Sequence, residues 1–97
     1  MVEVIKKIPE GYVVEFSLPG KPGQENFVAG SFNDWAPECA PMEFSAADDC
    51  YRRKLTLPPG SYEYKFVVDG RWILDDSNPN FTANDFGTLN SVLNLGY

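Results

Sequence analysis

The chain has no histidine, two cysteines among its 97 residues, and eight lysines and arginines against fourteen aspartates and glutamates. Without histidine, most metal sites and the serine–histidine or cysteine–histidine pairs of nucleophilic enzymes are disfavoured. The net charge of −6 argues against nucleic acid and anionic membranes as partners, because neutralising phosphates needs clustered basic side chains. The sequence also has no apolar run long enough to span a bilayer.

The first ten residues hold no apolar stretch of signal-peptide length, so a cytoplasmic location is expected. That compartment is reducing, and disulfides are rare in it. Cys39 and Cys50 are therefore expected to be free thiols.

Enzyme chemistry has little support in the sequence. Glycoside hydrolysis needs two carboxylates that face each other across a sugar. The pairs Asp48-Asp49 and Asp75-Asp76 are sequence neighbours, so their side chains point apart in an extended chain. We interpret both pairs as turn residues and expect no catalysis.

The stretch "DSNPNF" (76–81) places Asp, Asn and Asn at alternate positions, as a calcium loop does. Phe81 stands where such a loop has its glycine, and Gly87 stands where it has glutamate. Asx turns explain the pattern better. We expect neither a metal site nor a cofactor.

What the sequence does have is alternation of apolar and polar residues, with eight glycines and eight prolines spread between the alternating segments. No stretch keeps a helical period over the roughly ten residues that a helix needs. The segments expected to form strands are 2–8, 12–18, 26–32, 42–44, 51–57, 62–68, 71–74 and 87–95. About seven or eight short strands predict an all-β fold, an immunoglobulin-like antiparallel β-sandwich, in a single domain over residues 1–97.

The sequence "VVDGRW" (67–72) contains the strongest hairpin signal of the chain, an Asp-Gly pair between apolar residues. With these two residues at the turn, Val67 pairs with Trp72, and cross-strand partners share a face of the sheet. Residues on the opposite, core face are Tyr62, Tyr64, Phe66, Val68 and Ile73. Trp72 is therefore expected on the solvent face near Lys65, where an exposed tryptophan is a candidate binding platform.

Two further features have both an ordinary and a functional interpretation. Trp35 follows "SFND" at the exit of a strand, where a tryptophan is more often partly buried packing than a ligand contact. In the last strand, Thr88 and Asn90 project away from the leucine face, which is also what an ordinary solvated strand shows.

Taken together, "VAGSFNDW", "LPPGSYEYKFVVDGRWILDD" and "DFGTLNSVLNL" resemble the signatures of a family 48 carbohydrate-binding module. This is the glycogen- and starch-binding β-sandwich of AMP-activated protein kinase β subunits. It is also similar to the early-set domains at the N-termini of isoamylases and branching enzymes. The resemblance runs from about Phe27 to Leu95 with its blocks in the family's order, and it implies an early-set sandwich that binds α-1,4-glucan.

The resemblance also implies which residues contact the glucan. Two tryptophans of the family stack on glucose rings, a lysine and a threonine–asparagine pair bind sugar hydroxyls, and a leucine pushes into the curved glucan. In this sequence the leucine position is occupied by phenylalanine, which keeps an apolar wedge of different shape. The implied carbohydrate-binding residues are Trp35, Lys65, Trp72, Phe86, Thr88 and Asn90.

Two classes of function follow. The first is a non-catalytic module that binds glycogen, starch or maltooligosaccharides, with a glycogen-active enzyme or kinase complex as a further partner. The second is a protein-interaction or interdomain-packing module that has lost glucan binding, as in many early-set domains attached to family 13 glycoside hydrolases. The full set of implied contact residues favours the first class.

Overall fold

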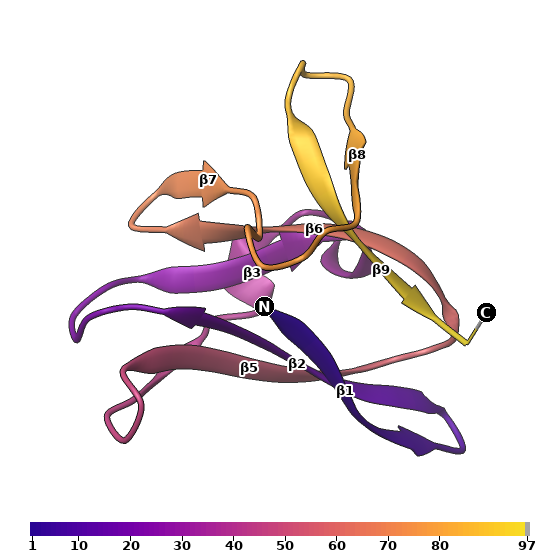
Figure 1. Cartoon of the computed structure of the whole chain (residues 1–97), viewed down its shortest axis with the longest axis horizontal. Coiled ribbons are helices and arrows are strands. Elements are labelled where there is room, and N and C mark those ends of the chain that lie inside the picture. The colour runs from indigo at the N-terminus through magenta and orange to yellow at the C-terminus, as the bar shows by residue number, and fades with distance from the viewer. Residues whose placement is uncertain (97) are drawn as a thin grey trace.

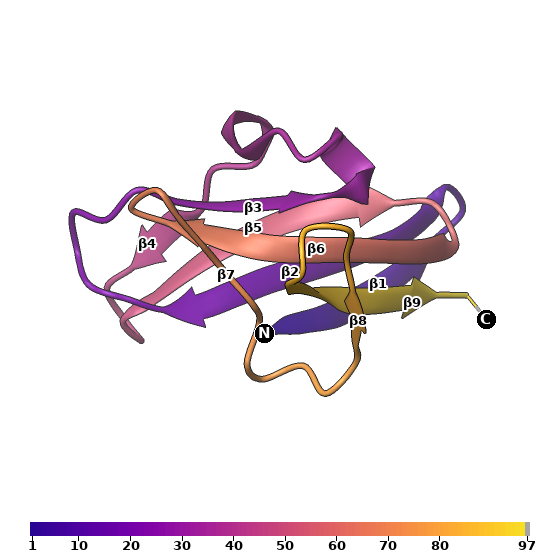
Figure 2. The same ribbon diagram turned by 90° about the horizontal axis from the view of Figure 1, so that it is seen from above.

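The structure is a computed structural model that describes residues 1–96. It shows two antiparallel sheets packed face to face (Figure 1 and, turned by 90°, Figure 2), and the predicted immunoglobulin-like β-sandwich is confirmed. The four-stranded sheet has the order β1-β2-β5-β4, formed by β1 (Val2–Ile8), β2 (Gly11–Pro19), β5 (Cys50–Leu57) and β4 (Glu43–Ser45). The five-stranded sheet has the order β3-β6-β9-β8, with β7 also paired to β6, formed by β3 (Asn26–Gly30), β6 (Gly60–Val68), β9 (Leu89–Leu95), β8 (Phe81–Ala83) and β7 (Arg71–Ile73). Two short 3-10 turns, η1 (Ser31–Asn33) and η2 (Pro37–Cys39), follow β3.

The core lies between the sheets and follows the alternation of the sequence. Phe16 of β2 meets Tyr64 of β6 edge to face, with ring centroids 5.0 Å apart, and Phe66 packs against Tyr64 in turn. All three side chains are fully buried, and each such burial contributes about 1.5–3 kcal/mol. Because β6 turns these aromatic residues inward, its alternate residues Glu63 and Lys65 must face outward.

Two residues of the β6–β7 hairpin depart from the predicted burial. Ile73 lies on the core face but remains 37% exposed, because the sheets do not close at this end and leave an open hollow between β2, β6 and β7. Val67 lies on the outer face but is buried. Its cross-strand partners Phe27 and Trp72 flank it on the same face and cover it.

The polar segment after β7 contains a strand that the sequence did not predict. β8 pairs with β9, placing Phe81 opposite Ser91 and Ala83 opposite Leu89, and the β8–β9 hairpin projects beyond the body of the sandwich (Figure 1). Before β8, the Asn78 side chain accepts the Asn80 N–H at 2.9 Å, as expected for an Asx turn. Three residues are too few for alternation to indicate a strand, so only the pairing with β9 defines it.

Asp75 is more than the turn residue that the sequence indicated, since it is buried in a polar network. Its carboxylate accepts hydrogen bonds from Tyr64 (2.6 Å), from the Ser77 hydroxyl (2.7 Å) and from the Met1 amino group (2.9 Å). Burial opposes ionisation, but these bonds prevail and hold the pKa of Asp75 below its usual value. Burial, together with the bond to Asp75, raises the pKa of Tyr64.

Candidate functional site

Trp72 is presented by the tight turn between β6 and β7. Asp69 and Gly70 have φ angles of 48° and 84°, the left-handed pair that a type I′ turn requires. The turn is tied to the start of β3, because Asp69 accepts the Glu25 N–H through its side chain (2.8 Å) and donates its own N–H to the Glu25 carbonyl (2.9 Å). The predicted pairing of Val67 with Trp72 is confirmed, and 47% of Trp72 is exposed on the outer face.

Trp35 is presented by a turn with a strained backbone. Asp34 and Trp35 have φ angles of 54° and 60°, a left-handed conformation that costs a non-glycine residue about 1–3 kcal/mol. The Trp35 N–H donates to the Gly30 carbonyl at 2.9 Å, and the Asn33 side chain accepts the Gly30 N–H at 3.0 Å. These bonds hold the strained turn, which fixes the direction of the half-buried indole.

Gly30 permits this turn to lie against β6. A Cβ at this position would come within 2.4 Å of the Glu63 carbonyl oxygen and 2.6 Å of the Phe32 ring. No other residue fits between these groups without moving the backbone, so the glycine of "VAGSFNDW" is required by close approach.

Phe86 stands at the tip of the loop between β8 and β9, with 91% of its surface exposed. The loop is closed by the Asn84 N–H, which donates to the Thr88 carbonyl at 2.9 Å, and by the Asn84 side chain, which accepts the Phe86 N–H at 3.0 Å. A large apolar side chain so fully exposed gains nothing from packing, and such residues mark binding surfaces when they gather.

The polar side chains of the site form one connected chain of hydrogen bonds. Asn90 donates to Glu63 at 3.0 Å, and Asn84 donates to both Asn90 (3.0 Å) and Thr88 (2.7 Å). Lys65 donates to the same Thr88 hydroxyl at 2.9 Å. The series of hydrogen bonds therefore begins at Glu63 and ends at Lys65, both on β6. Such a network, with each member partnered, holds its side chains in fixed orientations.

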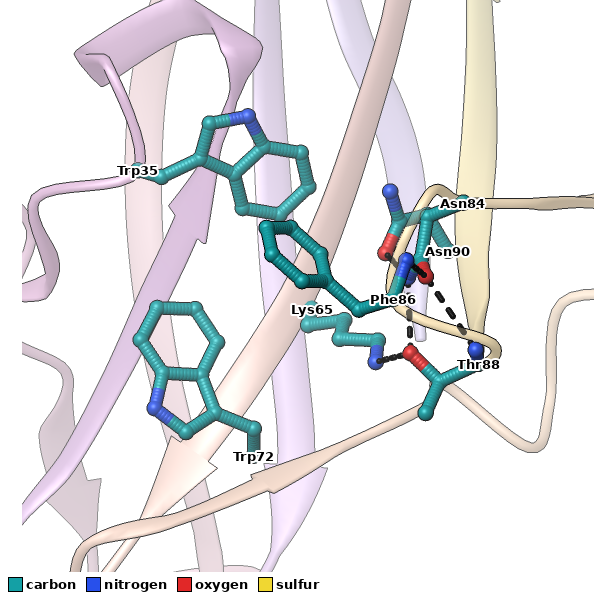
Figure 3. A pocket seen from close by; sticks show the side chains of 7 residues that line it. All are labelled: Trp35, Lys65, Trp72, Asn84, Phe86, Thr88 and Asn90. Atoms are coloured by element: carbon teal, nitrogen blue, oxygen red, sulfur yellow. Dashed lines mark hydrogen bonds between the residues drawn. The ribbon is translucent and has the colours of Figure 1, made fainter.

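These elements enclose one hollow of about 300 Å³ on the outer face of the five-stranded sheet. Figure 3 shows Trp35 and Trp72 on one side, the polar chain on the other, and the Phe86 ring extending from its loop toward the tryptophans. The residues that line the hollow are Trp35, Lys65, Trp72, Asn84, Phe86, Thr88 and Asn90. The structure therefore brings all six residues predicted from the sequence into one place.

Asn84 is the lining residue that the sequence reasoning missed. Its only sequence signal is a position at the start of "NDFG", where asparagine and aspartate commonly form turns. That signal predicts a turn and says nothing of contacts with Thr88 and Asn90, which depend on how β8 pairs with β9.

The lining consists of aromatic, amide, hydroxyl and ammonium side chains. Its seven residues include no carboxylate or thiol, so they offer no acid–base pair for glycoside hydrolysis. Within residues 1–96, no three His, Cys, Asp or Glu side chains gather to hold a metal ion. No helix in that part of the chain is long and apolar enough to cross a membrane.

Comparison with known proteins gives a consistent match. Residues 12–96 match the family described as the glycogen recognition site of AMP-activated protein kinase. The chain is 40% identical over 73 residues to the β-2 subunit of 5′-AMP-activated protein kinase from Homo sapiens, which is 75% of this chain and 25% of that protein. The β-1 subunit from Sus scrofa is 34% identical over 73 residues, which cover 56% of its sequence.

A solved structure is similar over the whole chain. The maltogenic amylase from S. marinus superposes with a TM-score of 0.79 at 20% identity, covering 100% of this chain and 16% of the amylase. At that identity the likeness concerns the fold alone. The chain spans only 26% of the length of the Mus musculus β-2 subunit and 16% of the length of the amylase.

Proposed function

The chain belongs to the family of glycogen recognition domains of AMP-activated protein kinase, and from this premise we propose that it binds α-1,4-linked glucan without acting on it. The binding surface is the hollow in which Trp35, Trp72 and Phe86 meet the hydrogen-bonded polar side chains of β6, β9 and the β8–β9 loop. That convergence of three aromatic side chains with fixed polar groups is the observation that carries the proposal.

The aromatic side chains suit the apolar faces of sugar rings. A pyranose has a face of C–H groups that lies flat on an indole, and covering exposed aromatic surface removes it from water. Trp35 follows the 3-10 turn η1 and Trp72 lies in β7, and backbone hydrogen bonds hold both segments. Each therefore offers a platform for one glucose ring at little further cost in conformational entropy.

The polar side chains suit the rim of the same sugars. Hydroxyl groups around a glucose ring need hydrogen-bond partners once they leave water. Lys65 and Thr88 face the hollow and can bind them, and few such groups among apolar ones are typical of a ligand site. Because an α-1,4 linkage curves the glucan, we expect two separate platforms that face one hollow to favour it over the flat β-1,4-glucans.

Phe86 supports a curved ligand as well. Its ring extends into the hollow from the side opposite the tryptophans, where the concave side of a bent glucan would lie (Figure 3). We propose that it fills this concavity as an apolar wedge.

The larger setting follows from the relatives. The chain spans about a quarter of the β-2 subunits that it matches, so we propose that this domain brings a kinase complex or a glycogen-active enzyme to its glucan. A cytoplasmic setting fits this role, and it also fits Cys39 and Cys50, which are both free thiols.

Sedimentation with insoluble polysaccharide tests the proposed function. The purified domain should sediment with amylose but not with cellulose, and free maltoheptaose should release it. An open, solvated site predicts a dissociation constant between about micromolar and millimolar. No reducing sugar should form.

A protein that stays in solution with both polysaccharides would contradict the proposal and favour an interdomain-packing module. Release of reducing sugar, abolished by a carboxylate substitution in this domain, would contradict the non-catalytic part. Arg71→Ala provides a matched control, because this exposed neighbour of Trp72 points to the opposite face and should leave sedimentation unchanged.

A further inference from the structure

The Asn84 side chain uses its full hydrogen-bonding capacity within one loop. Its Nδ2 donates to Thr88 Oγ1 at 2.7 Å and to Asn90 Oδ1 at 3.0 Å. Its Oδ1 accepts the backbone N–H groups of Phe86 (3.0 Å) and Thr88 (3.1 Å). A side-chain amide has two N–H donors and two acceptor lone pairs, so Asn84 is saturated and held in one orientation.

This saturation determines what Thr88 offers to a ligand. Thr88 Oγ1 accepts one hydrogen bond from Asn84 and another from Lys65 Nζ at 2.9 Å. A hydroxyl has two lone pairs and one hydrogen. Both lone pairs are occupied, so the hydroxyl can meet a ligand in the hollow only as a donor.

The same reasoning applies to Asn90 and Lys65. Asn90 Oδ1 accepts one hydrogen bond from Asn84, which uses one of its two lone pairs, and one N–H of Asn90 Nδ2 donates to Glu63 at 3.0 Å. Lys65 carries three N–H donors and uses one of them on Thr88. These two side chains retain three N–H donors, one on Asn90 and two on Lys65, against a single free lone pair on Asn90 Oδ1, so donors predominate.

We infer that Asn84 is a positioning residue that sets the hydrogen-bond polarity of the hollow, making Thr88 a donor, so that the site selects ligands through their acceptor oxygens. The inference rests on the proposed function, and it specifies how a glucan is held: its hydroxyl and ring oxygens accept hydrogen bonds from the protein. Asn84 acts through Thr88 and Asn90 and through the loop that carries Phe86.

Two substitutions separate the two halves of the Asn84 amide. Asn84→Asp keeps an oxygen that accepts the Phe86 and Thr88 N–H groups, so the loop keeps its shape. The second carboxylate oxygen replaces Nδ2 and accepts the Thr88 hydroxyl hydrogen, which then turns away from the ligand. Asn84→Ala removes both halves. Asn80→Ala is the matched control, because Asn80 is exposed and its side chain has no hydrogen-bond partner among residues 1–96.

The experiment measures maltoheptaose affinity by calorimetry, and amide hydrogen exchange of Phe86 and Thr88 in the ligand-free proteins. For Asn84→Asp we expect retained protection of both amides with affinity weakened at least about fivefold, as for the loss of one or two hydrogen bonds. Asn84→Ala should lose both protection and affinity. Asn80→Ala should match the wild type in both measurements.

A double-mutant cycle with Thr88→Val distinguishes positioning from a general structural role. In the wild type, Thr88→Val should weaken binding several-fold, because it removes the donated hydrogen. In the Asn84→Asp background it should weaken binding by less than about twofold, because that hydrogen no longer faces the ligand. A purely structural role for Asn84 would leave the two effects equal.

The outcomes distinguish failure of the proposed function from failure of the inference about Asn84. Wild-type protein that does not bind maltoheptaose refutes the proposed function, and this inference with it. Wild-type binding that Asn84→Asp leaves unchanged, or an additive cycle with Thr88→Val, overturns the inference and leaves the proposed function intact.

Discussion

Replacing Trp72 by alanine should weaken α-1,4-glucan binding about tenfold. Trp72 leaves 47% of its surface exposed. If a whole tryptophan offers about 250 Å², about 120 Å² of this indole is open to a ligand. A glucose ring that covers about half of this area gains about 1.5 kcal/mol at about 25 cal/mol/Å², which is close to a factor of ten in affinity. Isothermal titration with maltoheptaose measures the change.

The same substitution should also reduce stability, because the other half of Trp72 packs against the sheet and covers Val67. We expect a loss of about 2 kcal/mol, below the 3–5 kcal/mol or so of a fully buried tryptophan. Ile73→Ala is the matched control. Ile73 is the next residue of β7, is 37% exposed and faces the other side of the sheet, so its loss should destabilise the fold but leave binding unchanged. Equal weakening of binding by both variants, or normal binding by Trp72→Ala, would refute the stacking argument.

Three further predictions concern the fold. Gly30→Ala should lower the free energy of unfolding in urea by about 1–3 kcal/mol, because its Cβ would lie 2.4 Å from the Glu63 carbonyl oxygen; a change below about 0.5 kcal/mol would contradict this. The ordinary pKa values of aspartate and tyrosine bound a range from about pH 4 to about pH 10. The lowered pKa of Asp75 removes stability as pH falls below this range, and the raised pKa of Tyr64 removes it as pH rises above it, so a urea midpoint unchanged at pH 3 and pH 11 would contradict the buried network. Both cysteines should titrate as free thiols in unfolded, unreduced protein, and a count of zero would argue for an oxidising compartment.

The fold and the direction of Trp72 could be predicted because local rules determine them. The Asp-Gly turn sets the register of the β6–β7 hairpin, and the period of two then assigns each side chain to a face. The same rule could not give the extent of burial. Ile73 is on the predicted face but exposed, since β7 ends where the sheets no longer cover each other.

The remaining parts of the site depend on contacts between different strands and loops. β8 is a three-residue strand that only its pairing with β9 defines, and this pairing places Asn84 beside Thr88 and Asn90. Asp75 becomes a buried carboxylate through Tyr64, eleven residues before it. No periodicity of a single segment contains such information. Resemblance to a family supplied the six site residues, and Asn84 lay outside the motifs that carried it.

The proposed site can be tested most directly through the indole N–H signals of the two tryptophans in a nitrogen-15 NMR titration. The chain contains only two tryptophans, Trp35 and Trp72, and both line the hollow, so each signal reports on one platform. On addition of maltoheptaose, both signals should shift along the same binding curve, and neither should move with a β-1,4-linked glucan of equal length. Signals that stay fixed with maltoheptaose, or that respond equally to the β-1,4-glucan, would contradict α-glucan binding at this hollow.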